Sequence, residues 1–281
     1  MPDAYADIRY RVQDHVATLT LDRPAKLNAW TPAMEKSVAR ALQHAAQDAA
    51  VRVIVLTGAG RGFCAGADMQ RLQGATEVTP SDLPQPTAAE AGRLTAVEES
   101  ELAANYRGRF GYLLAIPKPI IAAINGPCAG IGLVLSLFCD LRFARTDAKL
   151  TTAFAQRGLI AEHGIAWILP RLIGPAHALD LLLSARPFSG SDAERLGLVN
   201  RAFAPESFEA EVQAYVQRLG REVSPRSLGI MKTQIWKALF QRFDESTELA
   251  DREMLESFKS ADFKEGVAHF VEKRAPRFTG S

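Results

Sequence analysis

The most constraining stretch of the sequence is PIIAAINGPCAGIGLVLSLFC, residues 119–139, because its 21 residues carry no charge. A helix of about 20 apolar residues would be long enough to cross a bilayer. The middle of the stretch argues against one continuous helix, because Asn125-Gly126-Pro127 is a turn sequence and proline cannot continue a helix. We therefore expect a strand over 120–124, a turn, and a short helix from about Gly130, all buried in protein rather than in lipid.

The segments before and after this stretch alternate between strand and helix. Thr31-Pro32 is an N-cap followed by proline, which predicts a helix to about residue 50 with Val38, Leu42 and Ala45 on one face. Runs rich in β-branched residues and bounded by turn formers predict strands at 8–12, 16–21 and 51–58, and a further strand at 140–144 continues the alternation. This alternation predicts an α/β fold in which helices cover a mixed sheet.

The chain becomes helical after Ser189. We expect a capping box formed by Ser191 and Glu194, a helix that begins at Ser224-Pro225, and a last helix capped by Asp262 with Glu265. We divide the chain into a core over 1–200 and a helical C-terminal region over 201–281. Residues 74–86 carry three prolines and no periodicity, which indicates a surface loop or lid edge.

Composition excludes several classes of partner. The 33 basic and 32 acidic residues give a formal charge of +1 without a long run of either sign, so we expect neither nucleic acid nor a membrane surface as partner. Cys64, Cys128 and Cys139 are odd in number and lack metal-ligand spacing, so we interpret them as small core residues and expect no metal site. Together with an N-terminus that lacks a secretory signal, they favour a reducing, cytoplasmic location.

Two glycine-rich segments follow predicted strands, GAGRGFCAGADM at 58–69 and NGPCAGIG at 125–132. Small residues let the main chain approach a ligand closely and direct its N–H groups at a negative charge. A turn, or close packing of a helix on the sheet, would explain either segment equally well. One N–H group from each segment could also converge on a single developing oxyanion, where each donor is worth about 3 kcal/mol. The weak dinucleotide-type pattern from Gly60 to Ala65 lacks the acidic residue that should close a second strand.

These two segments, with CDLRFA after the second, resemble the signatures of the crotonase family, also called the enoyl-CoA hydratase/isomerase family. The resemblance continues through SGSDAERLGLVNRAF at 189–203 and FVEKRAPRF at 270–278. It implies a crotonase-type ββα spiral core with a helical C-terminal trimerisation region. It also implies an acyl-CoA substrate of fatty acid metabolism, with coenzyme A as part of the substrate and no prosthetic group. The thioester carbonyl would be held by the N–H groups of Ala67 and Ile131.

The same resemblance implies which residues contact coenzyme A. Those at matching positions, or directly beside the two donors, are Lys26, Leu27, Ala65, Gly66, Asp68, Met69 and Gly130. Phe270 and Lys273 match a pair that reaches the coenzyme A of a neighbouring subunit, which implies a homotrimer or a dimer of trimers. From the residues alone, Phe270 would be a core anchor and Lys273 a solvated charge.

The acid/base residues depart from the hydratase pattern. Family hydratases use two glutamates, and the matching positions here hold Val134 and Phe154, neither of which can move a proton. Family isomerases place one carboxylate in a G-x-x-P-E or G-x-x-P-D stretch, and Gly158 to Glu162 matches this apart from Ala161. Glu162 is therefore the predicted acid/base, although most loop glutamates are simply solvated. Its neighbour His163 could orient Glu162 or meet substrate, whereas a lone histidine is usually structural.

Four activities stay open at this point. We favour isomerisation of 3-enoyl-CoA to 2-enoyl-CoA, in which one carboxylate removes a proton and returns it two carbons along the chain. Hydration of 2-enoyl-CoA with Glu162 as the sole acid/base is the first alternative. A retro-Claisen carbon–carbon hydrolase assisted by His163 and a non-catalytic acyl-CoA-binding protein are the others.

Overall fold

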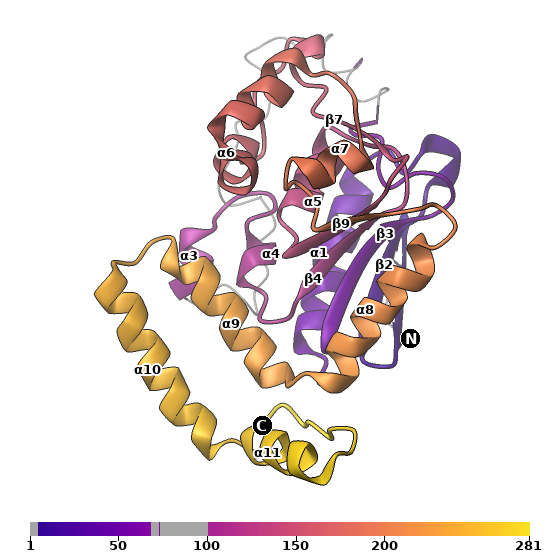
Figure 1. Ribbon diagram of the computed structural model, residues 1–281. Helices are drawn as coiled ribbons and strands as arrows, with labels where there is room; N and C mark the ends of the chain where they lie inside the picture. Colours follow the sequence, from indigo (N-terminus) through magenta and orange to yellow (C-terminus); the bar gives the residue numbers. More distant parts are fainter. Residues whose placement is uncertain (1–4, 69–72, 74–100) are drawn as a thin grey trace.

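The fold is built on a six-stranded sheet in the order β1-β2-β3-β4-β6-β9. The computed structural model describes residues 5–68, 73 and 101–281 of the chain (Figure 1). The strands are β1 (Ile8–Gln13), β2 (Val16–Leu21), β3 (Val53–Gly58), β4 (Ile120–Ile124), β6 (Leu141–Arg145) and β9 (Arg201–Phe203). β1 pairs antiparallel with β2, and each following pair is parallel. The predicted mixed sheet is confirmed, and β9 adds a strand that the sequence analysis did not predict.

Helices cover both faces of this sheet. Alternation along β3 sends Ile54 and Leu56 into one apolar cluster and Val53 and Val55 into another. On the first face, α1 (Pro32–Gln47) buries Val38, Leu42 and Ala45 as predicted, and the Thr31 hydroxyl accepts a hydrogen bond from Met34 N. On the second face lies α8 (Phe208–Glu222), with Phe208, Val212 and Val216 buried. The parallel strands are therefore apolar on both sides, as a covered sheet requires.

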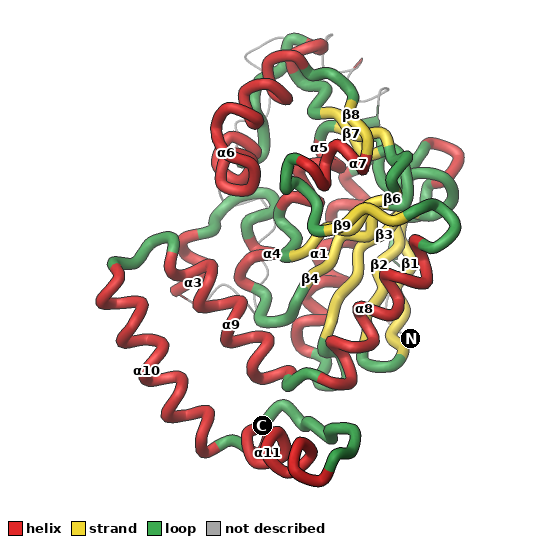
Figure 2. The backbone as a smooth tube through the Cα atoms, viewed as in Figure 1, coloured by secondary structure: helices red, strands yellow, loops and turns green. Residues whose placement is uncertain are grey.

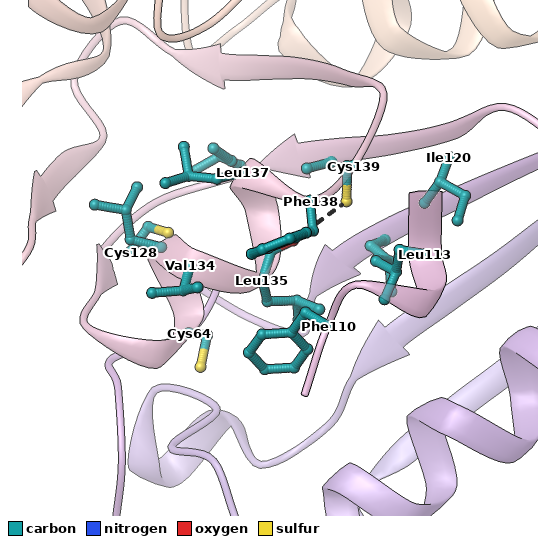
Figure 3. Packing of buried hydrophobic residues seen from close by; sticks show 14 of the residues in the cluster. Cys64, Phe110, Leu113, Ile120, Cys128, Val134, Leu135, Leu137, Phe138 and Cys139 are labelled. Carbon is teal, nitrogen blue, oxygen red and sulfur yellow. Dashed lines mark hydrogen bonds between the residues drawn. The ribbon is translucent and has the colours of Figure 1, made fainter. Parts of the chain in front are cut away.

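The uncharged stretch 119–139 folds as strand, turn and helix. It forms β4, β5 (Cys128–Ala129) and α5 (Ile131–Leu137), and every residue of α5 is buried. β5 joins β7 (Lys149–Thr151) and β8 (Phe188–Ser189) in a second, smaller sheet (Figure 2). In the buried cluster around α5 (Figure 3), the rings of Phe110 and Phe138 lie 6.4 Å apart. The predicted burial of this stretch in protein is confirmed.

One helix combines high apolarity with partial exposure. The apolar helix α6 (Ile165–Ser184) has the length and composition of a membrane span, and about a third of its apolar window is buried. Gly174, with φ 75° and ψ 158°, interrupts the helix between Pro170 and Pro175 and divides it into two shorter segments. Its N-terminal part packs against α5 and against the 3₁₀ turn η3 (Ala155–Arg157).

Helices dominate the chain after residue 200. They are α8, α9 (Pro225–Ala238), α10 (Phe243–Lys259) and α11 (Ala261–Glu272), preceded by α7 (Gly190–Arg195). The remaining short helices are η1 (Pro24–Lys26), α3 (Glu101–Asn105) and α4 (Tyr112–Ala115). Because β9 still pairs with β6, the sheet extends into the range 201–281 that we assigned to the C-terminal region. The loop expected at 74–86 lies outside the described residues.

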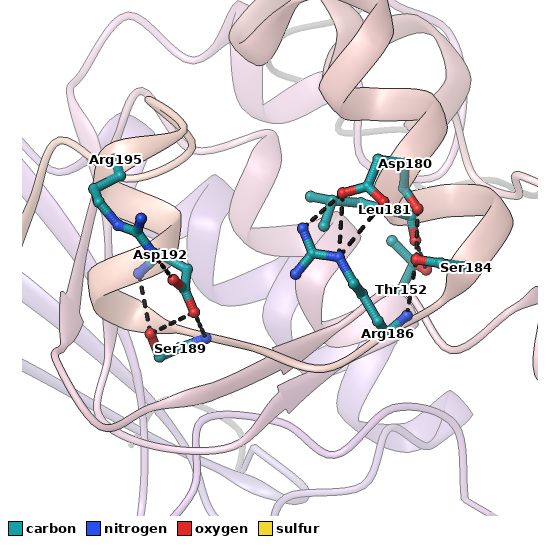
Figure 4. A network of polar contacts seen from close by, with 8 residues as sticks. All are labelled: Thr152, Asp180, Leu181, Ser184, Arg186, Ser189, Asp192 and Arg195. Carbon is teal, nitrogen blue, oxygen red and sulfur yellow. Dashed lines mark hydrogen bonds and ion pairs between the residues drawn. The ribbon is translucent and has the colours of Figure 1, made fainter.

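Two of the predicted helix caps are wrong, and the third is confirmed. Ser189, the extended last residue of β8, caps α7 and forms the capping box with Asp192, instead of Ser191 with Glu194 (Figure 4). Ser260 caps α11, because the Asp262 carboxylate instead accepts hydrogen bonds from Thr279 N and Gly280 N of the C-terminal tail. Ser224 caps α9 as predicted. Both errors have the same cause. The tertiary fold, and not the sequence spacing, decides which backbone N–H groups lie within reach of a serine or aspartate side chain.

A buried ion pair holds α9 against the core. Lys232 Nζ lies 2.7 Å from Asp140 Oδ2 and donates hydrogen bonds to the carbonyl oxygens of Leu113 and Lys118. Trp236 Nε1 donates to Asp140 Oδ1 at 3.0 Å. Burial lowers the pKa of Lys232, and the charge of Asp140 opposes that shift. The pair therefore fixes where the C-terminal helices leave the core.

Replacing one partner of this pair should be costly for stability. We expect Lys232→Met to lower the free energy of unfolding by about 3 kcal/mol, because it leaves the Asp140 carboxylate buried without a counter-charge. Urea denaturation at a fixed protein concentration measures the change. Asp140→Asn combined with Lys232→Met should recover part of the loss, since no unpaired charge remains.

The exposed pair of Arg186 with Asp180 provides the control, and Arg186→Met should unfold close to wild type. Equal destabilisation by Lys232→Met and Arg186→Met would contradict the role given to the buried pair.

Candidate active site

The candidate site is a cavity of about 470 Å³ where the two glycine-rich segments meet the loop that follows β7. Its walls come from η1, the strand ends at 65–68 and 130–131, and residues 152–163. The predicted site residues on these walls are Lys26, Ala65, Gly66, Ala67, Asp68, Gly130, Ile131, Glu162 and His163. The structure thus brings together segments that lie more than a hundred residues apart in the chain.

The two glycine segments are joined directly by backbone hydrogen bonds. Cys64 and Cys128 form a parallel bridge, in which Ala129 N donates to Cys64 O at 2.9 Å. Gly66 has φ +101°, and a Cβ atom there would lie 3.3 Å from Ala129 O. A Cβ atom on Gly130, at φ +49°, would lie 3.9 Å from Gly66 Cα. Only glycine fits this left-handed backbone readily, so the sequence fixes the close approach of the two segments.

This pairing leaves two N–H groups free to serve a ligand. In the parallel bridge between Trp30 and Ala67, Trp30 N donates to Gly66 O and Asp68 N donates to Trp30 O, so the N–H of Ala67 is not used. Ile131 is the first residue of α5, whose N–H has no partner within its own helix. Among the described residues, no backbone hydrogen bond starts from Ala67 N or Ile131 N. Both predicted oxyanion donors therefore line the cavity and are available to an acceptor.

Cys64 lies directly beside this arrangement and serves in packing. The side chain is fully buried, and burial raises the pKa of its thiol to about 12. A Cβ atom on Gly132 would lie 2.6 Å from Cys64 Cβ, so α5 packs against this cysteine as closely as a glycine allows. The interpretation of Cys64 as a core residue is confirmed, and a thiolate nucleophile is disfavoured.

Glu162 reaches the cavity from the loop between η3 and α6. Gly158, His163 and Gly164 all have positive φ, which folds this loop back over the cavity. Burial raises the pKa of Glu162, and the positive charge of Arg109 opposes that shift. A carboxyl group with a raised pKa is suited to accept and return a proton near neutral pH.

Arg109 is a wall residue that the sequence analysis did not identify. Its Nε and Nη2 donate to the two carboxylate oxygens of Glu35 at 2.8 and 2.6 Å. Its Nη1 lies 3.3 Å from His163 Nε2, which itself lies 3.5 Å from Glu162 Oε2. An isolated arginine and a glutamate within a helix carry no sequence signal that would join them, since α1 and residue 109 meet only in the folded chain.

The other predicted residues lie around or outside the cavity. Leu27 packs beside Gly62 and is not among the wall residues, and Met69 lies outside the described residues. Phe270, 80% exposed, and Lys273 belong to α11 and its C-cap and do not line this cavity. Of the two hydratase-type positions, Val134 is fully buried in α5 and Phe154 lies in the cavity wall.

A second, apolar cavity of about 590 Å³ lies between this loop and α6. Phe154 and Leu159 are shared by the walls of both cavities. Elsewhere its lining is aliphatic, with Ile160, Leu179 and Leu183 the most exposed members. The wall of the candidate site at Phe154 and Leu159 is therefore apolar, whereas Arg109 contributes a charge elsewhere on the wall.

Comparisons with known proteins match the chain along almost its whole length. The family model described as enoyl-CoA hydratase/isomerase matches residues 11–281. A 1,2-epoxyphenylacetyl-CoA isomerase of Escherichia coli is 34% identical over 96% of this chain and 97% of its own, and a probable enoyl-CoA hydratase of Rhodobacter capsulatus is 35% identical over 99% of each. The crystal structure of an enoyl-CoA hydratase from Bacillus anthracis superposes with a TM-score of 0.84 at 26% identity, covering 98% of this chain and all of that one.

The raised pKa of Glu162 predicts a pH-dependent cost to stability. The pKa of a glutamate carboxyl group is near 4.5 in the unfolded chain and is higher for Glu162 in the folded protein. Such a group contributes fully to stability below pH 4.5, and this contribution is lost as the pH rises through the folded pKa. We expect Glu162→Gln to raise the midpoint of thermal unfolding at pH 8 and to leave it unchanged at pH 4. Differential scanning calorimetry at both pH values measures the effect. A Glu162→Gln protein that unfolds below wild type at pH 8 would contradict the assigned direction.

Proposed function

The chain belongs to the crotonase (enoyl-CoA hydratase/isomerase) family and has its fold, and from this premise we propose that it converts 3-enoyl-CoA into 2-enoyl-CoA. Glu162 is the acid/base of the proposed reaction. The N–H groups of Ala67 and Ile131 hold the thioester oxygen, and coenzyme A enters as part of the substrate.

The observation that carries this proposal is the difference between the two carboxylates on the described cavity wall, Asp68 and Glu162. Asp68 forms an ion pair with Arg23 at 3.0 Å, which engages its Oδ2 atom. Glu162 has the raised pKa that a proton carrier needs. A single proton-transferring carboxylate is enough for isomerisation and falls short of the pair that hydration ordinarily uses.

The proposed steps follow from these groups. Glu162 takes a proton from C2 of the 3-enoyl chain, and the electrons move onto the thioester oxygen to form a dienolate. The two N–H groups stabilise that oxygen, each by about 3 kcal/mol. Glu162 then returns the proton to C4, and the double bond comes to lie between C2 and C3. The product has the same atoms as the substrate, so no water or cofactor is consumed.

Hydration is the second candidate, and the hydratase names of many relatives favour it. Addition of water across the double bond needs one group to activate water and another to deliver the α-proton. Val134 and Phe154 supply neither, so Glu162 would have to do both in turn. The name of the Escherichia coli relative, an isomerase of a CoA thioester, supports rearrangement without water as the main activity.

The decisive variant is Glu162→Gln, which keeps the shape of the side chain and removes its proton affinity. We expect conversion of 3-enoyl-CoA to 2-enoyl-CoA to fall about 10²–10⁴-fold, the range that general acid–base catalysis contributes. Binding of a saturated acyl-CoA, followed by calorimetry, should be unchanged. Products from 3-enoyl, 2-enoyl and β-keto thioesters are identified by chromatography and mass.

Glu194→Gln, on the exposed face of α7, is the matched control and should retain wild-type turnover. Normal isomerisation by Glu162→Gln would contradict the proposal. A product heavier by one water would favour hydration, and cleavage of a β-diketone without coenzyme A would favour the carbon–carbon hydrolase. Tight thioester binding without turnover of any substrate would favour a non-catalytic acyl-CoA-binding protein.

We also propose that the chain assembles as a homotrimer or a dimer of trimers. Large apolar side chains are exposed along the C-terminal helices, namely Met231, Ile235, Phe243, Leu255, Phe258, Phe270 and Val271. Large apolar side chains exposed in this number support association. Sedimentation equilibrium should give a mass of three or six times 30.6 kDa. A mass of one chain at micromolar concentration would contradict the assembly.

A further inference from the structure

Glu35 and Arg109 form a pair that borders the cavity from two separate elements. Glu35 belongs to the first turn of α1, and Arg109 lies in the segment between α3 and α4. Their side chains are 26% and 23% exposed, so the pair is partly desolvated. Neither residue takes part in the proposed proton transfer or in holding the thioester oxygen.

The geometry of this pair is fixed on several sides. Arg109 donates to both oxygens of Glu35, the planar arrangement in which guanidinium and carboxylate bind most specifically. Trp30 Nε1 also donates to Glu35 Oε2 at 3.3 Å. Phe110, the residue after Arg109, packs edge to face against Trp30 and His163. Arg109 therefore presents its remaining nitrogen, Nη1, in a defined direction.

That nitrogen faces the imidazole of His163. The Nη1 atom lies 3.5 Å from Nδ1 and 3.3 Å from Nε2, and Nε2 lies 3.5 Å from Glu162 Oε2. An arginine nitrogen can only donate, and a carboxylate oxygen can only accept. A proton on Nε2 lets the neutral imidazole donate to Glu162 Oε2 and leaves Nδ1 as the acceptor for Arg109 Nη1 at 3.5 Å, while the 3.3 Å approach of Nη1 to Nε2 is then a contact without a hydrogen bond.

We propose that Glu35 and Arg109 are positioning residues that act through His163 to orient the Glu162 carboxylate and to keep its surroundings close to neutral. The proposal rests on the proposed function of Glu162. Arg109 alone would place a positive charge beside the catalytic carboxylate and favour its ionised form, which would make it a weaker base. The bidentate contact with Glu35 offsets that charge while leaving the guanidinium plane in place to hold the imidazole.

In the part of the chain that the structure describes, the other charged side chains on the cavity wall come from three further segments. Lys26 of η1, Asp68 after the first glycine segment and Arg157 of η3 line the same cavity. Asp68 is paired with Arg23, and Arg157 Nη1 donates to Ala153 O at 2.8 Å. These groups stay unchanged when the Glu35–Arg109 pair is altered, so the effect of the pair is separable from theirs.

The neutralising role predicts opposite effects from the two halves of the pair. Glu35→Gln leaves Arg109 uncompensated, so the acidic limb of the kcat/KM profile should move down by at least about half a pH unit. Arg109→Gln leaves Glu35 uncompensated, so the limb should move up by a similar amount. The double variant should return the limb close to its wild-type position. Each single variant should also lower kcat by about tenfold with KM unchanged, because His163 loses its fixed neighbour.

The titration of Glu162 is also measurable without turnover. The ¹³C carboxyl resonance of Glu162, assigned by its disappearance in Glu162→Gln, should titrate with the same opposite shifts in the two variants. Normal turnover by Glu162→Gln would remove the proposed function, whereas this resonance would still test the pair. Arg109→Lys keeps the charge and loses the bidentate contact, so it should retain the pH profile while kcat stays reduced.

Shifts of the same sign in Glu35→Gln and Arg109→Gln, or no shift in either, would overturn the proposal. Urea denaturation of each variant separates loss of folding from loss of positioning. If a glutamine variant does not fold, Glu35→Asp and Arg109→Lys keep the charges and allow the same comparison of kcat. We expect a reduced kcat in both variants. A wild-type kcat would contradict the positioning role.

Discussion

The backbone pairing between residues 63–66 and 127–130 is the constraint on which the site depends. The bridge from Cys64 to Cys128 joins two segments that each follow a parallel strand of the large sheet. Because parallel strands end at the same edge, the sheet delivers both segments to one place, and the glycines then allow the backbones to touch. The two N–H donors gain their positions from this pairing and not from side chains. Side chains lining the cavity can therefore vary without moving the donors.

The fold was predictable from local sequence where local preference and tertiary environment agree. The β-branched runs at 16–21 and 53–58 became central strands because the same residues favour extended backbone and fill both covered faces of the sheet. The short sheet of β5, β7 and β8 was not predictable, since its strands span two or three residues and exist through their pairing. The capping errors at Ser191 and Asp262 show the same limit, because the fold assigns polar side chains to backbone ends that sequence spacing cannot identify.

Some residues of the candidate site could be identified from the sequence, and others could not. Gly66, Gly130 and Glu162 were identifiable, because motif spacing and family resemblance bear on backbone shape and on a single carboxylate. The contact of Arg109 with Glu35 was not identifiable, since it joins two positions 74 residues apart with no shared pattern. Sequence motifs predict backbone conformation, such as that of the two glycine-rich segments. The electrostatic surroundings of a reactive group instead come from side chains that meet only in three dimensions.

The distribution of charge around the cavity supports the proposal that one carboxylate carries the proton. Asp68 is held by Arg23 and Glu35 by Arg109, so these two acidic groups each have a cationic partner at 3.0 Å or less. Among residues 5–68, 73 and 101–281, no lysine or arginine forms an ion pair with Glu162, which instead faces the His163 imidazole at 3.5 Å. Its desolvation is consequently offset only in part, which raises its pKa, while the charges of Asp68, Glu35 and Arg109 are balanced within their own ion pairs. Moving one proton between two carbons, as we propose, needs a group that holds the proton neither too tightly nor too weakly. The pairing of Asp68, Glu35 and Arg109, combined with the partial burial of Glu162, is an arrangement that would supply such a group from an ordinary glutamate.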